Sequence, residues 1–323
     1  MKITDYEKVQ QLTDTNIFLL DGDNGTKTIL APALAKALVG LMSSQDFISG
    51  LNLSELNQMN TFAAGDKILV GTAAGNKSIG ASDALFAMLD AFSTVEMRRT
   101  IFRGKNLGVV VTAEQKANIQ NGSFKGFFLG DYWSIGERIW RIADFNYWIN
   151  CGDSTVPPNH LVIMPDNSLY TSKMNETDIT TGGYVGSKMY TEGLNQAKTL
   201  VTSAFPDMVL THRTFLVNEV TNGKPSGGAW FDSTLELPNE NMMYGSHIFM
   251  PQSDGVTTVV SFTINNSQLA LMAAHPRFIK TREFYWLMDV VSSTHFADVS
   301  DKGVADCSSA TNSFGVRPVF AIG

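Results

Sequence analysis

The chain lacks the residue patterns of disulfide-stapled, nucleic-acid-binding and membrane-anchored proteins. Two cysteines among 323 residues, Cys151 and Cys307, are too few for a disulfide framework, and we expect both to be free thiols. The 24 Lys and Arg are outnumbered by 31 Asp and Glu and form no basic run, which argues against a nucleic-acid partner. No stretch approaches the roughly 18 apolar residues of a membrane span, and the N-terminus shows no secretory-signal pattern. The sequence therefore predicts no membrane anchor and no signal peptide.

Motifs of the common enzyme classes are missing as well. The sequence holds no G-x-S-x-G, no Walker motif and no dinucleotide-binding fingerprint after a strand. Its five histidines are scattered, and no pair shows metal-ligand spacing: His160, His212, His247, His275 and His295. We expect the first four to be structural or surface residues. The sequence thus predicts no catalytic residues, no metal site and no cofactor.

What the chain does contain is an internal repeat near its start. Residues 16–29 and 66–79 match at a common offset, and each copy is predicted to form a strand, a Gly-containing turn and a second strand. Helices are expected over 31–42 and 82–92, where apolar residues recur at helical spacing. The turn over 21–25 looks superficially like a calcium loop, but the distal acidic ligand of an EF-hand is absent, so we interpret it as a turn.

A transition follows the repeats. Residues 96–122 contain the densest charge cluster, which we interpret as a solvated face or an intersubunit contact: Glu96, Arg98, Arg99, Arg103 and Lys105. Thr112 is predicted to cap a short helix from Ala113 to Gln120, with Glu114 in its first turn to complement the helix dipole.

From Phe124 onward the composition shifts to aromatic-rich strands. Apolar runs broken by Gly130 and Gly136 indicate a hairpin, and residues 160–164 indicate a further strand. Residues 187–205 are predicted to be helical, and the apolar run from Leu210 to Val220 is interpreted as a helical continuation. The 44% hydrophobic content is enough for a large core, and the length suggests about two domains.

The last forty residues interleave two kinds of position. We call the first set the frame, because its members are apolar or small and are expected to be fixed by packing; it includes Trp286, Phe296, Gly315 and Val316. The second set, the filling, consists of short polar or reactive side chains between them. Such a pattern is typical of a binding surface on a rigid scaffold. Residues 300–303 are predicted to form the turn of a hairpin, followed by a polar loop.

The final run, GVRPVFAI, is predicted to return as a buried strand. Pro318 cannot donate to a sheet ladder, so this strand is expected to have an edge or a bulge at that point. Arg317 is flanked by apolar residues, and we expect it to pair with a carboxylate or with backbone carbonyls rather than with a ligand.

The spacing of W-L-x-D-V-V, F-A-x-V-x-x-x-G-x-A and G-V-R-P resembles the C-terminal variable region of phage and prophage proteins with a C-type-lectin-like fold, some of which are diversified by retroelements. The phage major tropism determinant is the best-known type. Residues 124–323 also resemble, less closely, a phage-associated domain related to the formylglycine-generating type of lectin fold. In the diversified class, adenines in a template copy are replaced at random, so an Asn codon can become any codon that ends in a pyrimidine. Such codons encode the residue types of the filling, but they do not encode Lys302 or Met288.

The internal repeat and the change in composition divide the chain into two small β-hairpin-plus-helix repeats over 1–48 and 49–95, a connector over 96–123 and a domain over 124–323. For this domain the resemblance implies a C-type-lectin-like ligand-binding fold with its variable region at 284–320, so the expected class is α+β. It further implies a virion protein that determines host attachment, binds a host cell-surface protein or glycan, contacts other virion proteins through its repeats and assembles as a homotrimer. The predicted ligand-binding residues are Thr294, His295, Asp298, Ser300, Asp301, Asp306, Cys307, Ser308, Ser309, Thr311, Asn312 and Phe314.

Two alternatives remain open at this point. Surface loops are commonly rich in Ser, Thr, Asp and Asn, so the filling has an ordinary explanation too. The protein is then a structural virion part, such as a head fibre or a capsid decoration protein, with no diversified receptor site. A near-copy of the coding sequence that differs only at adenines would favour the receptor-binding interpretation.

Two activities of related folds are not expected. Residues 237–240, LPNE, come close to a sugar-binding calcium triplet of lectins but lack the preceding acid. The oxidase that makes formylglycine needs a cysteine pair at its active site, and Cys151 and Cys307 are far apart in the sequence.

Overall fold

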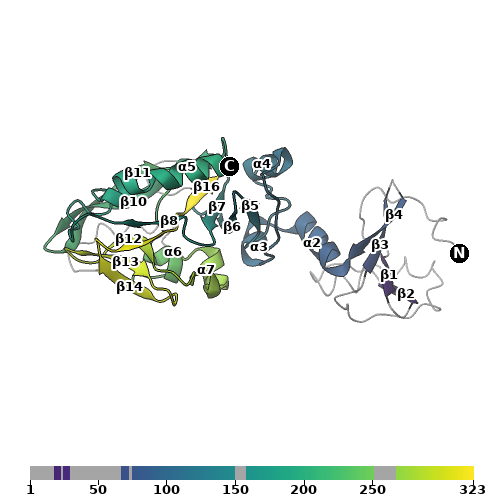
Figure 1. The fold of residues 1–323 in the computed structure, drawn as a ribbon. Helices are drawn as coiled ribbons and strands as arrows, with labels where there is room; N and C mark the ends of the chain where they lie inside the picture. The colour runs from purple at the N-terminus through teal and green to yellow at the C-terminus, as the bar shows by residue number, and fades with distance from the viewer. Residues whose placement is uncertain (1–17, 23–24, 30–66, 73–74, 150–157, 251–266) are drawn as a thin grey trace. The chain divides into compact units, whose positions relative to one another are not determined.

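The computed structural model describes residues 18–22, 25–29, 67–72, 75–149, 158–250 and 267–323 (Figure 1). The chain divides into two compact units, residues 1–92 and residues 93–323. The described residues form mostly strands, with few helices, which makes the class α+β. Within the described residues, no helix combines the length and the apolar character that crossing a bilayer requires.

The smaller unit contains both predicted hairpins. Its strands are β1 (Phe18–Gly22), β2 (Gly25–Ile29), β3 (Lys67–Thr72) and β4 (Gly75–Gly80), followed by helix α2 (Ala81–Phe92). The two hairpins join through β1 and β3 into one antiparallel sheet of order β2-β1-β3-β4. A lone hairpin is marginal in water, and pairing the two removes an edge from each. The helix predicted over 31–42 lies outside the described residues.

The larger unit holds two five-stranded sheets and a separate hairpin. The first sheet has the order β14-β13-β12-β15-β8 and the second β5-β6-β7-β16-β9, while β10 pairs only with β11. The strands of the first sheet are β8 (Tyr170–Lys173), β12 (Tyr285–Val290), β13 (His295–Val299), β14 (Ala305–Ser309) and β15 (Ser313–Val316). Those of the second are β5 (Tyr132–Ile135), β6 (Arg138–Phe145), β7 (Leu161–Pro165), β9 (Val209–Leu210) and β16 (Phe320–Ile322).

Short helices surround these sheets. They are α3 (Val95–Thr100), α4 (Ala113–Gln120), a π-helical turn (Met189–Gly193) that leads into α5 (Asn195–Ala204), α6 (Glu240–Tyr244), α7 (Ala270–Ala274) and a 3-10 turn (Pro276–Phe278). The predicted cap of α4 is confirmed: Thr112 Oγ1 accepts from the Gln115 amide at 3.1 Å, and Gln115 Oε1 accepts from the Thr112 amide at 3.0 Å. These reciprocal bonds satisfy two amides that the helix cannot pair internally.

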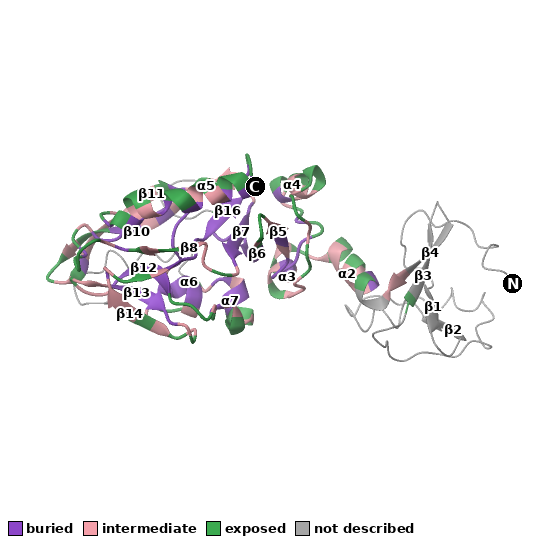
Figure 2. Cartoon of the chain, viewed as in Figure 1, coloured by how far each residue is buried: buried purple, intermediate pink, exposed green. Residues whose placement is uncertain are grey.

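Two buried clusters of apolar side chains hold the larger unit together, and both draw on the two sheets. Figure 2 shows buried residues on strands of both sheets, such as β7 and β13. In one of them Trp140 on β6, Phe205 at the end of α5 and Phe320 on β16 meet with ring centroids 5.6–5.8 Å apart. Trp286 and Phe296 belong to the same cluster and are fully buried. The frame of the last forty residues and the aromatic strands from Phe124 onward therefore share one core.

Two of the hairpins have turns built from residues with positive φ. Gly136 and Glu137 both have positive φ, at 58° and 61°, and join β5 to β6 as the sequence predicts. The helical continuation proposed for Leu210 to Val220 is wrong, because that run forms strand β10 (His212–Thr221), which pairs with β11 (Lys224–Ser233). The turn between them is Asn222-Gly223, with φ of 50° and 73°. This dipeptide is among the strongest hairpin signals, and the run before it is rich in Thr, Val and Phe.

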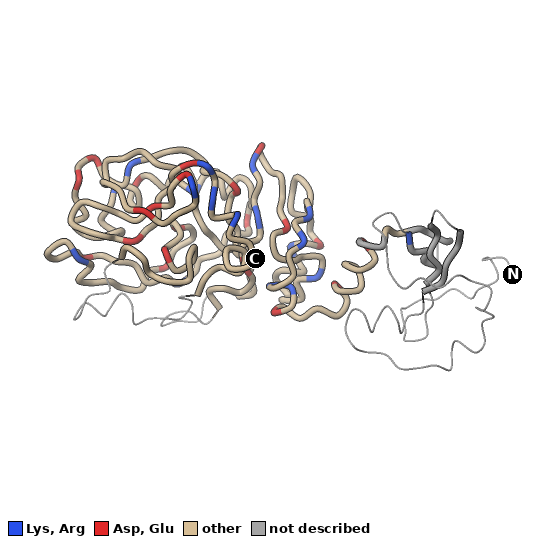
Figure 3. Tube along the Cα trace, turned by 90° about the horizontal axis from the view of Figure 1, so that it is seen from below, with Lys and Arg blue, Asp and Glu red and all other residues tan. Residues whose placement is uncertain are grey.

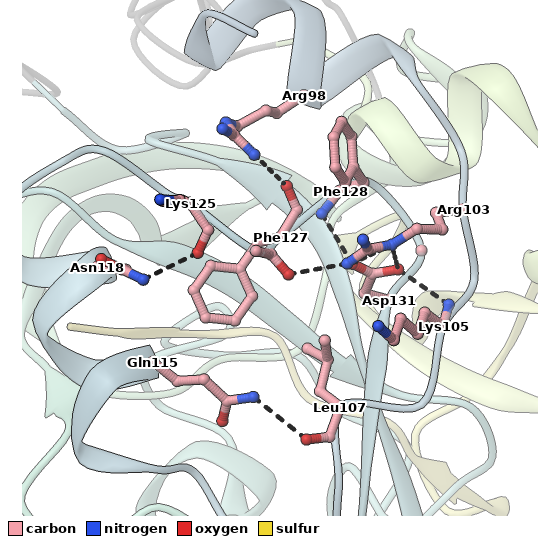
Figure 4. Close-up of polar contacts among 12 residues, drawn as sticks. Arg98, Arg103, Lys105, Leu107, Gln115, Asn118, Lys125, Phe127, Phe128 and Asp131 are labelled. Carbon is pink, nitrogen blue, oxygen red and sulfur yellow. Dashed lines mark hydrogen bonds and ion pairs between the residues drawn. The ribbon is translucent and has the colours of Figure 1, made fainter. Parts of the chain in front are cut away.

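The connector over 96–123 packs within the larger unit (Figure 4). The guanidinium of Arg103 pairs with the buried Asp131 carboxylate, which also accepts from the Lys105 amide at 2.9 Å, and Arg98 Nη1 donates to the Phe127 carbonyl at 3.1 Å. Arg99 pairs with the buried Asp144. The interpretation of these arginines as a solvated face is wrong for Arg98, which is 2% exposed.

A close approach fixes the connector further. Gly130 has a φ of 78°, and a Cβ at this position would lie 2.1 Å from the ring of Phe102. Only glycine leaves room for that ring, so Phe102 packs the connector against Gly130, just before strand β5.

The last residues of the chain serve both five-stranded sheets. The run GVRPVFAI is not one strand: β15 ends at Val316 in the first sheet and β16 begins at Phe320 in the second. The break falls at Arg317 and Pro318, where the sequence predicts an edge or a bulge. Arg317 is 1% exposed and donates from Nε to the Pro165 carbonyl at 2.9 Å, which confirms that it pairs with backbone.

Candidate functional site

The structure distributes the twelve predicted site residues over several places. Five lie at one end of the β13–β14 hairpin and in the loop that follows it: Thr294, His295, Ser309, Thr311 and Asn312. Four lie along the two paired strands: Asp298, Asp306, Cys307 and Ser308. Ser300 and Asp301 lie in the turn at the other end of the hairpin, and Phe314 lies on β15.

Strand geometry explains why neighbouring site residues do not share a surface. Side chains alternate between the two faces of a sheet, so Asp306 and Ser308 on β14 point to one face while Cys307 and Ser309 point to the other. The turn with Ser300 and Asp301 is separated from Thr294 by the five residues of β13, roughly 17 Å at about 3.3 Å per residue.

Exposure was expected for all twelve residues, and the structure corrects this at two of them. Asp298 is 0% exposed and Ser300 is 8% exposed. Asp298 lies opposite Trp286 of β12 on one side and opposite Asp306 of β14 on the other, so β13 is an inner strand. Its residues from Phe296 to Val299 are all buried, so both faces of the sheet are covered along this part of the strand. The Ser300 hydroxyl accepts from the Val304 amide at 3.2 Å and so belongs to the hairpin turn.

Asp298 is a buried acid with an unusual electrostatic environment. Neither of its carboxylate oxygens makes a hydrogen bond of standard geometry within the described part of the chain. Burial raises the pKa of Asp298 to about 7; the Ser308 hydroxyl on the same face opposes this rise, and the Asp306 carboxylate adds to it. Asp298 therefore contributes to the interior of the sheet rather than to a ligand face.

Phe314 also acts as a packing residue. Its ring lies 5.0 Å from that of Phe284 and 4.7 Å from that of Trp286, between centroids. It is half-buried against the main core cluster. The sequence places Phe314 in the filling because it lies among polar residues. Its contacts show that it belongs to the frame instead.

The residues that the structure does bring together form a surface that we call the polar end face: Asp178, Ser292, Ser293, Thr294, His295, Thr311 and Asn312. Backbone hydrogen bonds tie its loops together. The Thr180 amide donates to the Ser293 carbonyl at 3.0 Å, the Ala310 amide to the Thr294 carbonyl at 2.9 Å, and the Asn175 amide to the Ala310 carbonyl at 2.9 Å. Three segments far apart in sequence, after β8, after β12 and after β14, thus meet at one end of the sheet.

A fourth segment, the tip of the β10–β11 hairpin, reaches the same end. A Cβ on Gly223 would lie 3.1 Å from the Ser293 amide nitrogen, so the turn packs directly on this loop. Asp178, Ser293 and Asn312 are exposed, and Ile179 beside them is 51% exposed. The face therefore offers short hydrogen-bonding side chains around one apolar side chain.

Two side chains of the face carry its main polar contacts. Asp178 Oδ1 accepts from the Thr311 amide at 3.1 Å and from its hydroxyl at 2.7 Å, and these bonds hold the pKa of Asp178 below its ordinary value. His295 Nδ1 lies 2.7 Å from Thr294 Oγ1 and 3.4 Å from Ser292 Oγ.

This arrangement of hydroxyls, imidazole and carboxylate does not have the geometry of a hydrolase triad. Both hydroxyls meet the same ring nitrogen of His295, whereas a triad places the nucleophile and the orienting acid on opposite nitrogens. Oδ1 of Asp178 accepts its hydrogen bonds from Thr311. The contacts of these residues are suited to holding loops in place and to binding polar groups.

Sequence reasoning missed Asp178, Thr180 and Gly223. Asp178 lies 133 residues before Thr311, and only the pairing of β8 with β15 brings their loops together. Gly223 carried a readable signal, since Asn-Gly indicates a hairpin turn, but nothing in the sequence says where that turn packs.

The described chain carries charges of both signs and one possible group of metal ligands. Figure 3 shows Lys and Arg interspersed with Asp and Glu along the described chain. Within that part of the chain, one group of side chains has ligand atoms close enough to hold a metal ion: Glu240, His247 and Asp289. Cys307 is a free thiol, whereas Cys151 lies outside the described residues.

Comparisons with protein-family models, with curated proteins and with solved structures find no match for the chain.

Proposed function

We propose that this protein is a phage virion component that binds the host surface through its polar end face. The observation that supports the proposal most is the convergence of four distant chain segments into one face that exposes Asp178, Ser293 and Asn312. Backbone hydrogen bonds tie three of these segments together, and the tip of the β10–β11 hairpin packs against them at Ser293. A rigid scaffold that holds variable short polar side chains is suited to recognising a protein or a glycan.

The proposal includes a C-type-lectin-like arrangement of residues 124–323. In its support, the frame residues of the resembling motifs, Trp286, Phe296 and Val316, are fully buried in one cluster. The proposed binding face is smaller than the sequence predicts, because Asp298 and Ser300 are buried and Phe314 packs on Trp286.

Single substitutions to arginine test the face. Ser293→Arg and Asn312→Arg place a large charged side chain on it, whereas Val304→Arg makes a similar change at an exposed residue in the hairpin turn at the far end of β13. Exposed substitutions seldom change the unfolding free energy by more than about 0.5 kcal/mol, so all three variants should melt close to the wild type.

The measurement is retention of labelled full-length protein on intact cells from a panel of bacteria. Ser293→Arg and Asn312→Arg should weaken retention by about tenfold or more, corresponding to about 1.4 kcal/mol of lost binding, while Val304→Arg leaves it unchanged. Equal retention of all three would contradict the assignment of the face. A wild type that binds no cell of the panel would favour a structural virion part instead.

We also propose that the protein is a homo-oligomer, a trimer by its resemblance to tropism determinants, because several weak sites on one particle bind with avidity. A mass measurement that finds a monomer at micromolar concentration would contradict this part of the proposal.

A further inference from the structure

Three ligand-type side chains meet between helix α6 and strand β12. Glu240 is the first residue of α6, His247 lies in the segment after that helix, and Asp289 lies on β12, 49 residues after Glu240. One ligand atom from each of the three lies within 4.8 Å of the other two. The Glu240 amide donates to Asp289 Oδ2 at 2.7 Å, which fixes the helix start against the strand.

The two carboxylates are buried side by side. Glu240 is 0% exposed and Asp289 is 4% exposed, and within the described residues neither forms an ion pair with Lys or Arg. Burying two neighbouring negative charges is costly unless a cation or a proton joins them. The cluster therefore calls for a positive partner, which no described Lys or Arg side chain supplies.

Glu240 has acceptor capacity left for such a partner. Its carboxylate accepts from the amides of Ile248, Phe249 and Met250 at 2.9, 2.8 and 3.0 Å, which wraps this segment around it. A carboxylate has about four acceptor positions, so these three bonds leave about one of them open toward the cluster. The three amides also fix where the carboxylate points.

His247 offers a ring nitrogen in the same place. Its Nδ1 is buried and has no hydrogen-bond partner within the described chain, and its Nε2 lies 3.1 Å from the Asn241 side-chain nitrogen. A half-turn of the Asn241 amide brings its oxygen to this place, where it accepts from an Nε2–H. Nδ1 then has a free lone pair, which is how a ligating histidine is oriented by an outer partner.

We propose that Glu240, His247 and Asp289 bind a divalent transition-metal ion of the Zn²⁺ or Mn²⁺ class. One imidazole nitrogen with two carboxylates suits these ions better than Ca²⁺ or Mg²⁺, which favour oxygen ligands alone. The ion ties the segment after α6 to β12 and so stabilises the sheet that carries the polar end face. This site is independent of the ligand that the face binds.

Metal-dependent melting of the full-length protein tests the site. After treatment with a chelator, the protein is melted alone and with added Zn²⁺, Mn²⁺, Ca²⁺ or Mg²⁺, and bound metal is counted after desalting. Zn²⁺ or Mn²⁺ should raise the melting temperature by several degrees and bind with one ion per chain, because a ligand that binds only the folded state stabilises it. Ca²⁺ and Mg²⁺ should have a smaller effect.

Two variants separate a metal site from a merely structural cluster. His247→Gln should weaken metal binding by about tenfold or more. The matched control is His295→Gln, which lies outside the cluster and should bind the metal ion as the wild type does. Asp289→Asn removes one buried charge, so it should melt higher than the metal-free wild type and no longer respond to metal.

The proposal is overturned if Zn²⁺ and Mn²⁺ leave the wild type unchanged at millimolar concentration. It is also overturned if His247→Gln and Asp289→Asn keep the wild-type response, since the metal then binds elsewhere. A higher melting temperature for Asp289→Asn without any metal effect on the wild type would show that a shared proton joins the two carboxylates.

Discussion

Asp178 and Thr311 are joined by two hydrogen bonds across 133 residues of sequence, at 3.1 Å from the Thr311 amide and 2.7 Å from its hydroxyl to the same carboxylate oxygen. This contact links the segment after β8 to the loop between β14 and β15. It fixes one loop of the polar end face by a side chain that is itself exposed.

The first prediction concerns this contact. Its hydrogen bonds hold the pKa of Asp178 below the ordinary 3.8, so the loop should stay closed above that pH and open as the pH falls through the lowered pKa. Asp178→Ala should remove the acceptor at every pH. Amide hydrogen exchange at Thr311 measures this: exchange should accelerate in the variant, and an unchanged rate would show that the loop is held by other contacts.

The second prediction concerns His212, which is fully buried and stacks on Trp148 with ring centroids 4.0 Å apart. Burial lowers the pKa of His212 from 6.5 to about 3, with His160 adding to the effect. Between these two pKa values the unfolded chain binds a proton at His212 and the folded chain does not. The unfolding free energy should therefore fall as the pH drops below about 6.5, by about 1.4 kcal/mol per pH unit.

His212→Phe keeps a ring for Trp148 and removes the titrating group. Urea unfolding between pH 4 and pH 8 measures the difference: the variant should lose stability less steeply than the wild type as the pH falls. Parallel curves for the two proteins would mean that His212 is not protonated on unfolding.

How far sequence predicts this molecule can be judged from particular residues. Thr112 with Gln115, the turn at Gly136 and Glu137, and the pairing of Arg317 with backbone all follow from signals within a few residues of sequence. The helix prediction for residues 210–220 failed because an apolar run of that length fits a strand or a helix equally well. The Asn222-Gly223 turn that settles the matter lies just beyond the run.

The site was harder to predict than the fold for a physical reason. Reading Asp298 and Asp306 as equivalent filling positions ignores that β13 is an inner strand and β14 an edge strand, which leaves one carboxylate buried and the other exposed. Strand order depends on pairings with β12 and β15, which are set by the whole core. The same holds for Asp289, whose meeting with Glu240 depends on where α6 packs.

The third prediction concerns Asp298, whose pKa is raised to about 7 by burial. Because the folded state holds a proton that the unfolded chain releases above its ordinary pKa of 3.8, stability should fall as the pH rises from about 4 to about 7. This slope is opposite in sign to that of His212. Asp298→Asn keeps the shape without the charge, so it should be more stable than the wild type above pH 7, and denaturant unfolding at pH 5 and pH 8 measures it. An equal stability difference at the two pH values would refute the raised pKa.

The fourth prediction concerns Gly223, where the β10–β11 hairpin meets the polar end face. Its φ of 73° lies in the left-handed region, and an added Cβ would come within 3.1 Å of the Ser293 amide nitrogen. Gly223→Ala should therefore cost about 1 kcal/mol or more in unfolding free energy, from the backbone and from the displaced loop together. Gly136→Ala is the matched control, because its φ is also positive, at 58°, but a Cβ there would meet nothing within 4 Å. Both variants should lose stability through the backbone, and only Gly223→Ala should also weaken cell retention. If the two lose stability equally and both bind cells as the wild type does, the hairpin tip does not support the face, which would then consist of the three remaining segments alone.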